Sequence, residues 1–302
     1  MLEIKIRKEN HAVAGVIEAL LLIGLVAIIL SIIQLHYIPK IMEQKEAEHM
    51  DEVSNQFSYL KNMIDIQAMA GTMGTDVSLA HAPIMTQITL GSRELPYFIT
   101  VPSYGELSIA DNEAKICANP PIGDLVSGIP FSSIVYHAYN MYFVEQTYVL
   151  EGGGIILNQS TEGGSVMRAS PAVSIKDIGD EIEMKFYLPN IIGVSGKNFT
   201  SGYGGCFIRT NYSSYQMYPL DRIPVGSGSF IIIYSHYLNA WNESFNRLFK
   251  DINIDPDNKV VDVSITKYEG MDVVRITPLS KSIDLELTIV DICTQLGPGW
   301  VT

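Results

Sequence analysis

The sequence is short of basic charge and of cysteine, and each shortage limits what the protein can do. Twenty Lys and Arg residues stand against 33 Asp and Glu residues, which gives a formal net charge of −13. Nucleic-acid binding depends on cations that displace the counterions of a phosphate backbone, so we expect no nucleic-acid partner. The three cysteines form no CxxC pair, which excludes a dithiol redox motif of that kind.

The familiar catalytic motifs are also missing. The chain has no HExxH, no GxSxG and no Walker loop. Residues 151–156 and 201–206 are rich in glycine, but neither stretch is followed by the helix that a phosphate site needs. The six histidines are scattered, with His36 and His49 on polar parts of an expected helix. We therefore expect no enzymatic activity, no cofactor and no metal site built on histidine.

One long apolar run near the N-terminus dominates what is present. Residues 13–35 would form a helix of about 35 Å, enough to cross a hydrocarbon layer of about 30 Å. A secretory signal has a shorter apolar core of about 7–15 residues and ends in a small-residue cleavage site, and no such site follows this run. Basic residues (Lys5, Arg7 and Lys8) precede the run and acidic residues follow it. This asymmetry predicts a cytoplasmic N-terminus and an external C-terminal part.

The helix is expected to continue beyond the apolar run to about residue 70. Pro39 removes one backbone donor and predicts a bend or an open turn, and Gly71 to Gly74 predict the stop. A stripe of apolar residues packs either on the protein's own head or on both the head and neighbouring copies, and the sequence leaves both open. The stripe consists of Met42, Met50, Val53, Phe57, Leu60 and Ile64.

Residues 72–302 predict a β-rich head. Short apolar runs are separated by turn residues, and several of them alternate with period two, as one buried face requires. Residues 236–251 instead have helical spacing. The expected fold is α+β: a long N-terminal helix followed by a mainly antiparallel β-sandwich with one packed helix. The predicted strands are residues 84–90, 106–110, 140–150, 154–159, 172–175, 181–188, 229–235, 259–268, 272–277 and 284–290.

These features together resemble one known family. A short basic leader, the stretch HAVAGVIEALLLIGLVAIIL, an amphipathic continuation and a β-rich C-terminal part resemble the archaeal type IV pilin-like proteins, which are related to pilins and archaellins and carry a class III signal peptide. Residues 142–175 resemble the β region of such proteins more loosely. The resemblance implies that residues 1–12 are a leader, cut between Ala12 and Val13 or, as the alternative, between Gly15 and Val16.

The resemblance also implies a function and partners. Residues 13–71 would anchor the chain in membrane lipid and later pack in the core of a surface filament made of copies of this chain. A prepilin peptidase and the pilus assembly machinery would be further partners, and the head (residues 72–302) would lie outside the cell with a possible adhesive role. The alternative is a single-pass anchored extracellular binding protein that never polymerises.

Particular residues of the apolar run bear on assembly. Glu18 is the carboxylate inside the run, and two interpretations stay open: pairing with the N-terminal amine of a neighbouring copy, which the resemblance suggests, or a position at the membrane interface. Small residues (Gly15, Gly24 and Ala27) allow close approach between helices.

Three weaker predictions concern the head. Glycosylation acceptor patterns begin at Asn158, Asn198, Asn211 and Asn242. A disulfide between Cys206 and Cys293 is the preferred pairing, with Cys117 left over. A calcium loop is suggested by Asp251, Asn253, Asp255 and Asp257, although Pro256 occupies the position where such a loop needs glycine.

Overall fold

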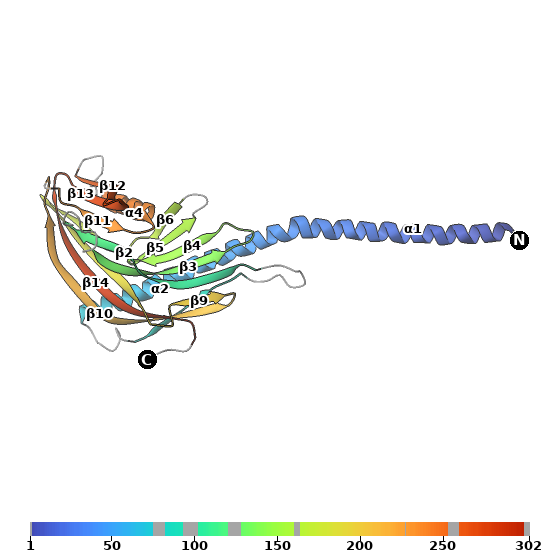
Figure 1. Cartoon of the computed structure of the whole chain (residues 1–302), viewed down its shortest axis with the longest axis horizontal. Coiled ribbons are helices and arrows are strands. Elements are labelled where there is room, and N and C mark those ends of the chain that lie inside the picture. Colours follow the sequence, from blue (N-terminus) through green and yellow to red (C-terminus); the bar gives the residue numbers. More distant parts are fainter. Residues whose placement is uncertain are drawn as a thin grey trace.

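The computed structural model describes residues 2–74, 82–92, 102–119, 128–159, 164–226, 228–252 and 260–298, with side chains from Ala14 onward and without those of residues 219–221. Within these residues the protein is an α+β molecule, in which a straight helical rod runs out of a curved β-rich head (Figure 1). The rod comprises α1 (Leu2–Ile32), a π-helical turn η1 (Ile33–Tyr37) and α2 (Ile38–Met73).

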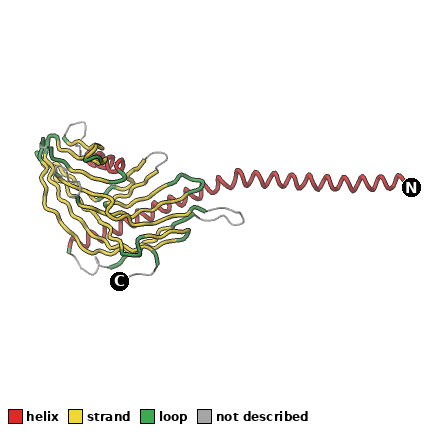
Figure 2. The backbone as a smooth tube through the Cα atoms, in the orientation of Figure 1, coloured by secondary structure: helices red, strands yellow, loops and turns green. Residues whose placement is uncertain are grey.

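The rod begins and ends where its residues dictate. Pro39 lies in the first turn of α2, where a missing backbone donor does least harm, and the wider π-turn directly before it absorbs the irregularity. The disruption predicted at Pro39 therefore takes the form of a π-turn, and the rod continues through it (Figure 2). At the far end Gly74 adopts φ 63°, a left-handed conformation that stops the helix as predicted.

A five-stranded sheet forms one layer of the head, in the order β1-β10-β14-β8-β7. Its neighbours pair antiparallel except β8 and β14, which run parallel. The strands are β1 (Ile84–Thr89), β7 (Ala172–Ile178), β8 (Glu181–Gly193), β10 (Gly205–Ile223) and β14 (Ser282–Leu296).

A nine-stranded antiparallel sheet forms the second layer, in the order β12-β13-β11-β2-β3-β4-β5-β6, with β9 paired to β2. Its strands are β2 (Tyr104–Ala118), β3 (Ile129–Tyr139), β4 (Gln146–Glu151), β5 (Gly154–Gln159), β6 (Gly164–Ala169), β9 (Phe199–Gly202), β11 (Ile231–Tyr234), β12 (Val261–Tyr268) and β13 (Met271–Pro278).

Two helices complete two separate apolar cores between the sheets. Helix α4 (Leu238–Asp251) places Trp241, Phe245 and Phe249 in the first core, among strands of both sheets. Helix α2 contributes its apolar stripe to the second core, again with strands of both sheets. The half of the rod that enters the head is therefore a structural part of it.

The predicted elements agree with the structure in most places. The long helix, its stop, the helix at residues 236–251 and most predicted strands are present. Strands β3, β6, β9 and β10 were not predicted. Residues 140–145, predicted as the start of a strand, instead form a turn that precedes β4.

Candidate functional site

The part of the rod outside the head exposes a continuous apolar surface. Except for the half-buried Ile33, its large apolar side chains are between 47% exposed at Val26 and 78% exposed at Leu35. Monomeric soluble proteins rarely expose apolar patches of such extent, and patches of this kind mark membrane or protein interaction sites. The helix is long and apolar enough to cross a membrane. This exposed half, together with its attachment to the head, is the candidate functional site.

The stripe on α2 has the opposite environment. Ile38 is already buried, and Met42, Val53, Phe57, Leu60 and Ile64 are completely buried. Val53, Phe57, Leu60 and Ile64 lie in the second core of the same chain. The sequence left open whether the stripe also reaches neighbouring copies. Completely buried side chains have no surface left for another copy, so the stripe packs on its own head.

Glu46 attaches the start of α2 to the head. Its carboxylate is completely buried and accepts three backbone hydrogen bonds, at 3.0 Å from Met141, 2.8 Å from Tyr142 and 2.7 Å from Phe143. The three donors are consecutive residues of the turn between β3 and β4. A buried carboxylate is tolerated where hydrogen bonds replace its hydration. The role of Glu46 could not be predicted from sequence, because its partners are about a hundred positions away.

A second buried polar contact lies one turn further along α2. The Nε2 atom of His49 lies 3.1 Å from the Tyr136 hydroxyl, which donates at 2.7 Å to the Leu90 carbonyl. Burial lowers the pKa of His49 and raises the pKa of Tyr136. A Cβ on Gly105 would lie 2.2 Å from the Leu90 oxygen, so this contact requires glycine there. The prediction that His49 occupies a polar part of the helix is wrong, because the head covers it.

Four predicted assembly residues, Gly15, Glu18, Gly24 and Ala27, lie on the exposed half of the rod. Glu18 is exposed, and a Cβ on Gly15 or Gly24 would meet nothing within 4 Å. Ala27 is exposed and accepts a hydrogen bond of 2.8 Å from Ser31 of the same helix. Their role in assembly stays a prediction.

The two predicted cleavage bonds both lie within helix α1. The bond between Ala12 and Val13 belongs to the part of α1 whose side chains are not described, and Val16 after the alternative bond is 60% exposed. Processing at either bond stays a prediction.

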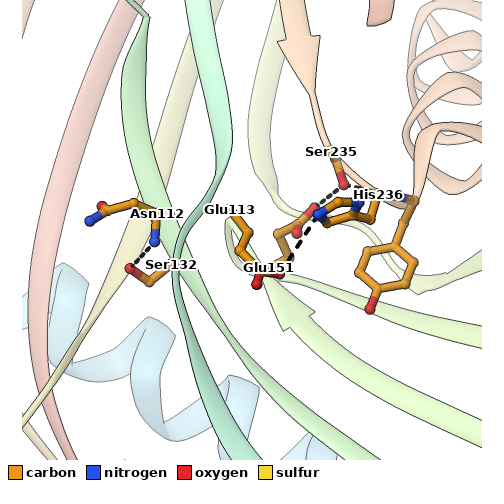
Figure 3. A network of polar contacts seen from close by, with 7 residues as sticks. Asn112, Glu113, Ser132, Glu151, Ser235 and His236 are labelled. Carbon is orange, nitrogen blue, oxygen red and sulfur yellow. Dashed lines mark hydrogen bonds and ion pairs between the residues drawn. The ribbon is translucent and has the colours of Figure 1, made fainter. Parts of the chain in front are cut away.

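A buried polar network joins α4 to the second sheet (Figure 3). Glu151, at the end of β4, accepts hydrogen bonds at 2.6 Å from the Ser235 hydroxyl and at 2.7 Å from the Trp241 indole. Burial raises the pKa of Glu151, and burial also raises the pKa of Tyr237 to about 12. Beside this network, His236 lies 3.9 Å from the Glu113 carboxylate, and both of these side chains are exposed.

This network stabilises the fold and does not have the geometry of a nucleophilic site. A serine nucleophile needs a base that takes its proton and is itself oriented by a third group. Here the Ser235 hydroxyl donates to the buried Glu151 carboxylate, while the Nε2 atom of His236 faces Glu113 (Figure 3). The network therefore fixes the start of α4 relative to β4.

The predicted glycosylation acceptors are all half-buried. Asn158 lies within β5, Asn211 lies within β10, and Asn242 lies on α4. The Oδ1 atoms of Asn198, Asn211 and Asn242 are buried and lack a hydrogen-bond partner among the described residues. Nothing in the structure tests glycosylation at these positions.

The predicted disulfide is wrong. Cys206 and Cys293 are not bonded to each other. Cys293 of β14 pairs with Asn211 of β10, five positions beyond Cys206 on the same strand. That separation is about 17 Å along a strand, far more than the roughly 7 Å that a disulfide spans between Cα atoms.

The predicted calcium ligands lie almost wholly outside the described residues. Asp251 ends α4 and is exposed, whereas Asn253, Asp255 and Asp257 are not described. Among the described residues, no group of three or more His, Cys, Asp or Glu side chains is arranged to hold a metal ion.

Comparison of the chain with family models, with curated proteins and with solved structures found no match. Inference about function therefore depends on the residues and on the geometry of the rod and the head.

Proposed function

We propose that the protein is a membrane-anchored subunit of a surface filament related to type IV pili, with the cytoplasmic N-terminus and the external head predicted from its charges. Before assembly, α1 lies in the bilayer. After removal of the leader, the apolar halves of many rods pack around a common axis, and the heads form the outer surface with a possible adhesive role.

One observation carries the proposal: the rod is divided into two halves by environment. Residues from Ile38 onward bury an apolar stripe in the head, whereas residues 14–37, mostly apolar, are exposed except for the half-buried Ile33. A soluble binding protein has no use for a projecting rod of this kind. A subunit that first dissolves in lipid and then packs with copies of itself uses the whole exposed half, and the buried half holds the head at a defined place on it.

The packing of such rods would depend on shape. Lipid tails are as apolar as the rods, so burial of apolar surface gives little preference for helix contact over lipid contact. Small residues at Gly15, Gly24 and Ala27 permit close approach, and a pairing of Glu18 would add direction. The open space around Gly15 and Gly24 is available to the side chains of a neighbouring rod.

A second candidate is a single-pass anchored protein that binds a partner through its head and does not polymerise. It is favoured by the length of the exposed run, since residues 14–35 span about 33 Å and a bilayer alone can cover them. Both candidates need the rod in the membrane, and they differ in what happens to the N-terminus afterwards.

The native N-terminus and the sheared surface fraction separate the two candidates. Mass spectrometry of the protein from its source cells should find a chain that begins at Val13 or Val16, and electron microscopy should find the chain in filaments sheared from the surface. An intact Met1, with the protein recovered only as detergent-extracted monomers, would refute the filament proposal.

Two substitutions test assembly separately from insertion. Glu18→Gln and Gly24→Leu should leave the protein in the membrane fraction but reduce its amount in the sheared fraction. Leu22→Ile, which keeps the volume and apolarity of a nearby position, is the control and should assemble as the wild type does. Equal assembly of all three variants would show that neither close packing nor the carboxylate directs the rods.

A further inference from the structure

The turn between β3 and β4 exposes two large apolar side chains at the end of the head where the rod emerges. Met141 is 64% exposed and Tyr142 is 39% exposed, although both follow a strand whose inward residues are buried. Figure 1 shows the ends of β3 and β4 beside the rod as it leaves the head. The exposed side chains therefore lie at the end of the head that faces the apolar half of the rod.

The turn is held rigidly in this position. Its three consecutive amides donate to Glu46, the Asn140 side chain donates at 2.8 Å to the Val144 carbonyl, and Phe143 packs against the second core. The backbone of the turn is thus bound to the rod. These hydrogen bonds hold the backbone of the turn in a position that leaves Met141 and Tyr142 exposed.

The rod sets the level of the turn relative to a membrane. Glu46 follows Ile38, the first buried residue of the rod, by eight positions, which is about 12 Å along the axis. Helical side chains lean toward the N-terminus, so the Glu46 carboxylate lies nearer the apolar run than its own Cα. A bilayer carries about 5–7 Å of headgroup region on each side of its hydrocarbon layer. Side chains of Met141 and Tyr142 that extend toward the run can reach that region.

Other exposed apolar residues lie on the rod between the apolar run and Glu46. Tyr37 is 61% exposed and Ile41 is 40% exposed. Because the head covers Ile38 and Met42, Tyr37 and Ile41 lie on the side of the rod that the head leaves open. Tyrosine is enriched where a protein meets the headgroup region, since its ring is apolar and its hydroxyl stays hydrated.

The charges around this level indicate which surface would be bound. Lys40 is exposed, and so are Glu43 and Glu145. This mixture has no excess of basic residues, so attraction to anionic lipid is not expected. Contact would depend on apolar and aromatic side chains, and a zwitterionic lipid surface would suffice.

We propose that the turn of residues 140–145 lies in the headgroup region of the bilayer that α1 spans, with Met141 and Tyr142 inserted among the lipids. Glu46 is the positioning residue that holds the turn there. This inference depends on the anchored state in the proposed function and is independent of filament assembly. Its consequence is that the membrane-anchored head has a fixed orientation, with the outer ends of β8 and β14 directed away from the lipid.

Quenching by brominated phosphatidylcholine tests the position of the turn. The full chain is reconstituted in vesicles of this zwitterionic lipid, with one tryptophan added at a time. Met141→Trp and Val26→Trp should each lose their added fluorescence. Ile178→Trp, at the exposed last residue of β7 and beside the first residues of β8 and β14, should not. These results should be unchanged in high salt.

The two controls separate this inference from the proposed function. Quenching at Val26→Trp without quenching at Met141→Trp would overturn the inference and leave the anchor intact. Absence of quenching at Val26→Trp would instead refute anchoring by α1. Quenching at Ile178→Trp as strong as at Met141→Trp would show that the head has no preferred orientation, and would also overturn the inference.

A second pair of variants tests Glu46. Replacing Glu46 by Gln turns one acceptor oxygen into a donor and removes at least one bond to the turn. Glu46→Gln should therefore weaken quenching at Met141→Trp and leave quenching at Val26→Trp unchanged. Glu48→Gln, at an exposed position on the same helix, is the matched control and should change neither. Undiminished quenching at Met141→Trp in a folded Glu46→Gln protein would refute the positioning role.

Discussion

Two halves of one helical rod, α1 and α2, have the same backbone and opposite surroundings. From Ala14 to the end of α1 the apolar side chains are exposed, whereas in α2 they form a stripe that the head buries. Continuous apolar coverage is typical of a helix that lies in lipid or among other helices. A single stripe is typical of a helix on the surface of a globular core. The change occurs at the π-turn and Pro39.

The difference shows that two segments of one continuous helix can have opposite environments. Removing atoms from α2 opens a cavity in the head, while removing them from α1 changes only a surface that awaits lipid or a neighbouring rod. Substitutions matched across the two halves therefore test the division directly, through the free energy of unfolding of the head.

The largest expected difference is between Phe57→Ala and Leu25→Ala. Phe57 is completely buried and packs near Tyr136 and Tyr148, so its truncation should lower the free energy of unfolding by about 3–5 kcal/mol. Leu25 is 58% exposed, and Leu25→Ala should leave that free energy unchanged. Urea unfolding of the full chain in detergent, followed by the fluorescence of the buried Trp241, measures both. Equal losses would mean that α1 also packs on the head.

Glu46→Gln should have the next largest effect. A buried hydrogen bond to a charged group contributes about 1.5–3 kcal/mol, and the substitution leaves at least one amide of the turn without an acceptor. Glu48→Gln removes an exposed ion pair with Lys45 and should leave the free energy of unfolding close to that of the wild type. The same urea experiment compares them. An unchanged free energy of unfolding in Glu46→Gln would show that water replaces the carboxylate at the turn.

Two glycines of the rod give a smaller contrast. A Cβ on Gly71 would lie 2.2 Å from the Tyr212 ring, so Gly71→Ala should lower the free energy of unfolding by about 1–3 kcal/mol. Gly24 has open space around it, and Gly24→Ala should leave the head as stable as before. Helix propensity alone would make Gly71→Ala more stable by about 1 kcal/mol. A loss of stability at Gly71 would therefore come from the contact with Tyr212. A gain in stability at Gly71 would show that Tyr212 moves aside freely.

The rod was predictable from sequence because its signals are local. The length of the apolar run, the three- and four-residue steps of the stripe and the glycines at its end all lie within the segment they describe. The turn at residues 140–145 was not predictable, because its amides bond to Glu46 about a hundred positions earlier. Its four consecutive apolar residues, Met141 to Val144, would otherwise suit a strand.

Buried polar residues explain most of what sequence reasoning missed in the candidate site. Glu46 and His49 look like surface residues of an amphipathic helix, and only contacts with distant strands make them internal. The cysteine pairing failed for a related reason, since spacing along the chain does not reveal register along β10 and β14. Such positions become visible only when the sheets are assembled.

The smallest expected effect is a pH dependence of the free energy of unfolding. It comes from His49, which lies on the buried half of the rod. Burial lowers the pKa of His49, partly opposed by the Glu52 carboxylate, so the unfolded chain takes up a proton more readily than the folded head. Stability from neutral His49 is present above its ordinary pKa of about 6.5 and is lost as the pH falls toward the lower folded value.

His49→Gln keeps a donor for the Tyr136 hydroxyl but cannot be protonated in this range, so its stability should fall less below pH 6.5 than that of the wild type. Glu151, whose pKa burial raises, contributes stability that is present below about pH 4.5 and lost as the pH rises, and it does so equally in both proteins. The difference between their urea midpoints across pH 5–7 therefore reports His49 alone. Parallel profiles would mean that the head admits water to His49, and that the buried half of the rod is less tightly covered than its packing indicates.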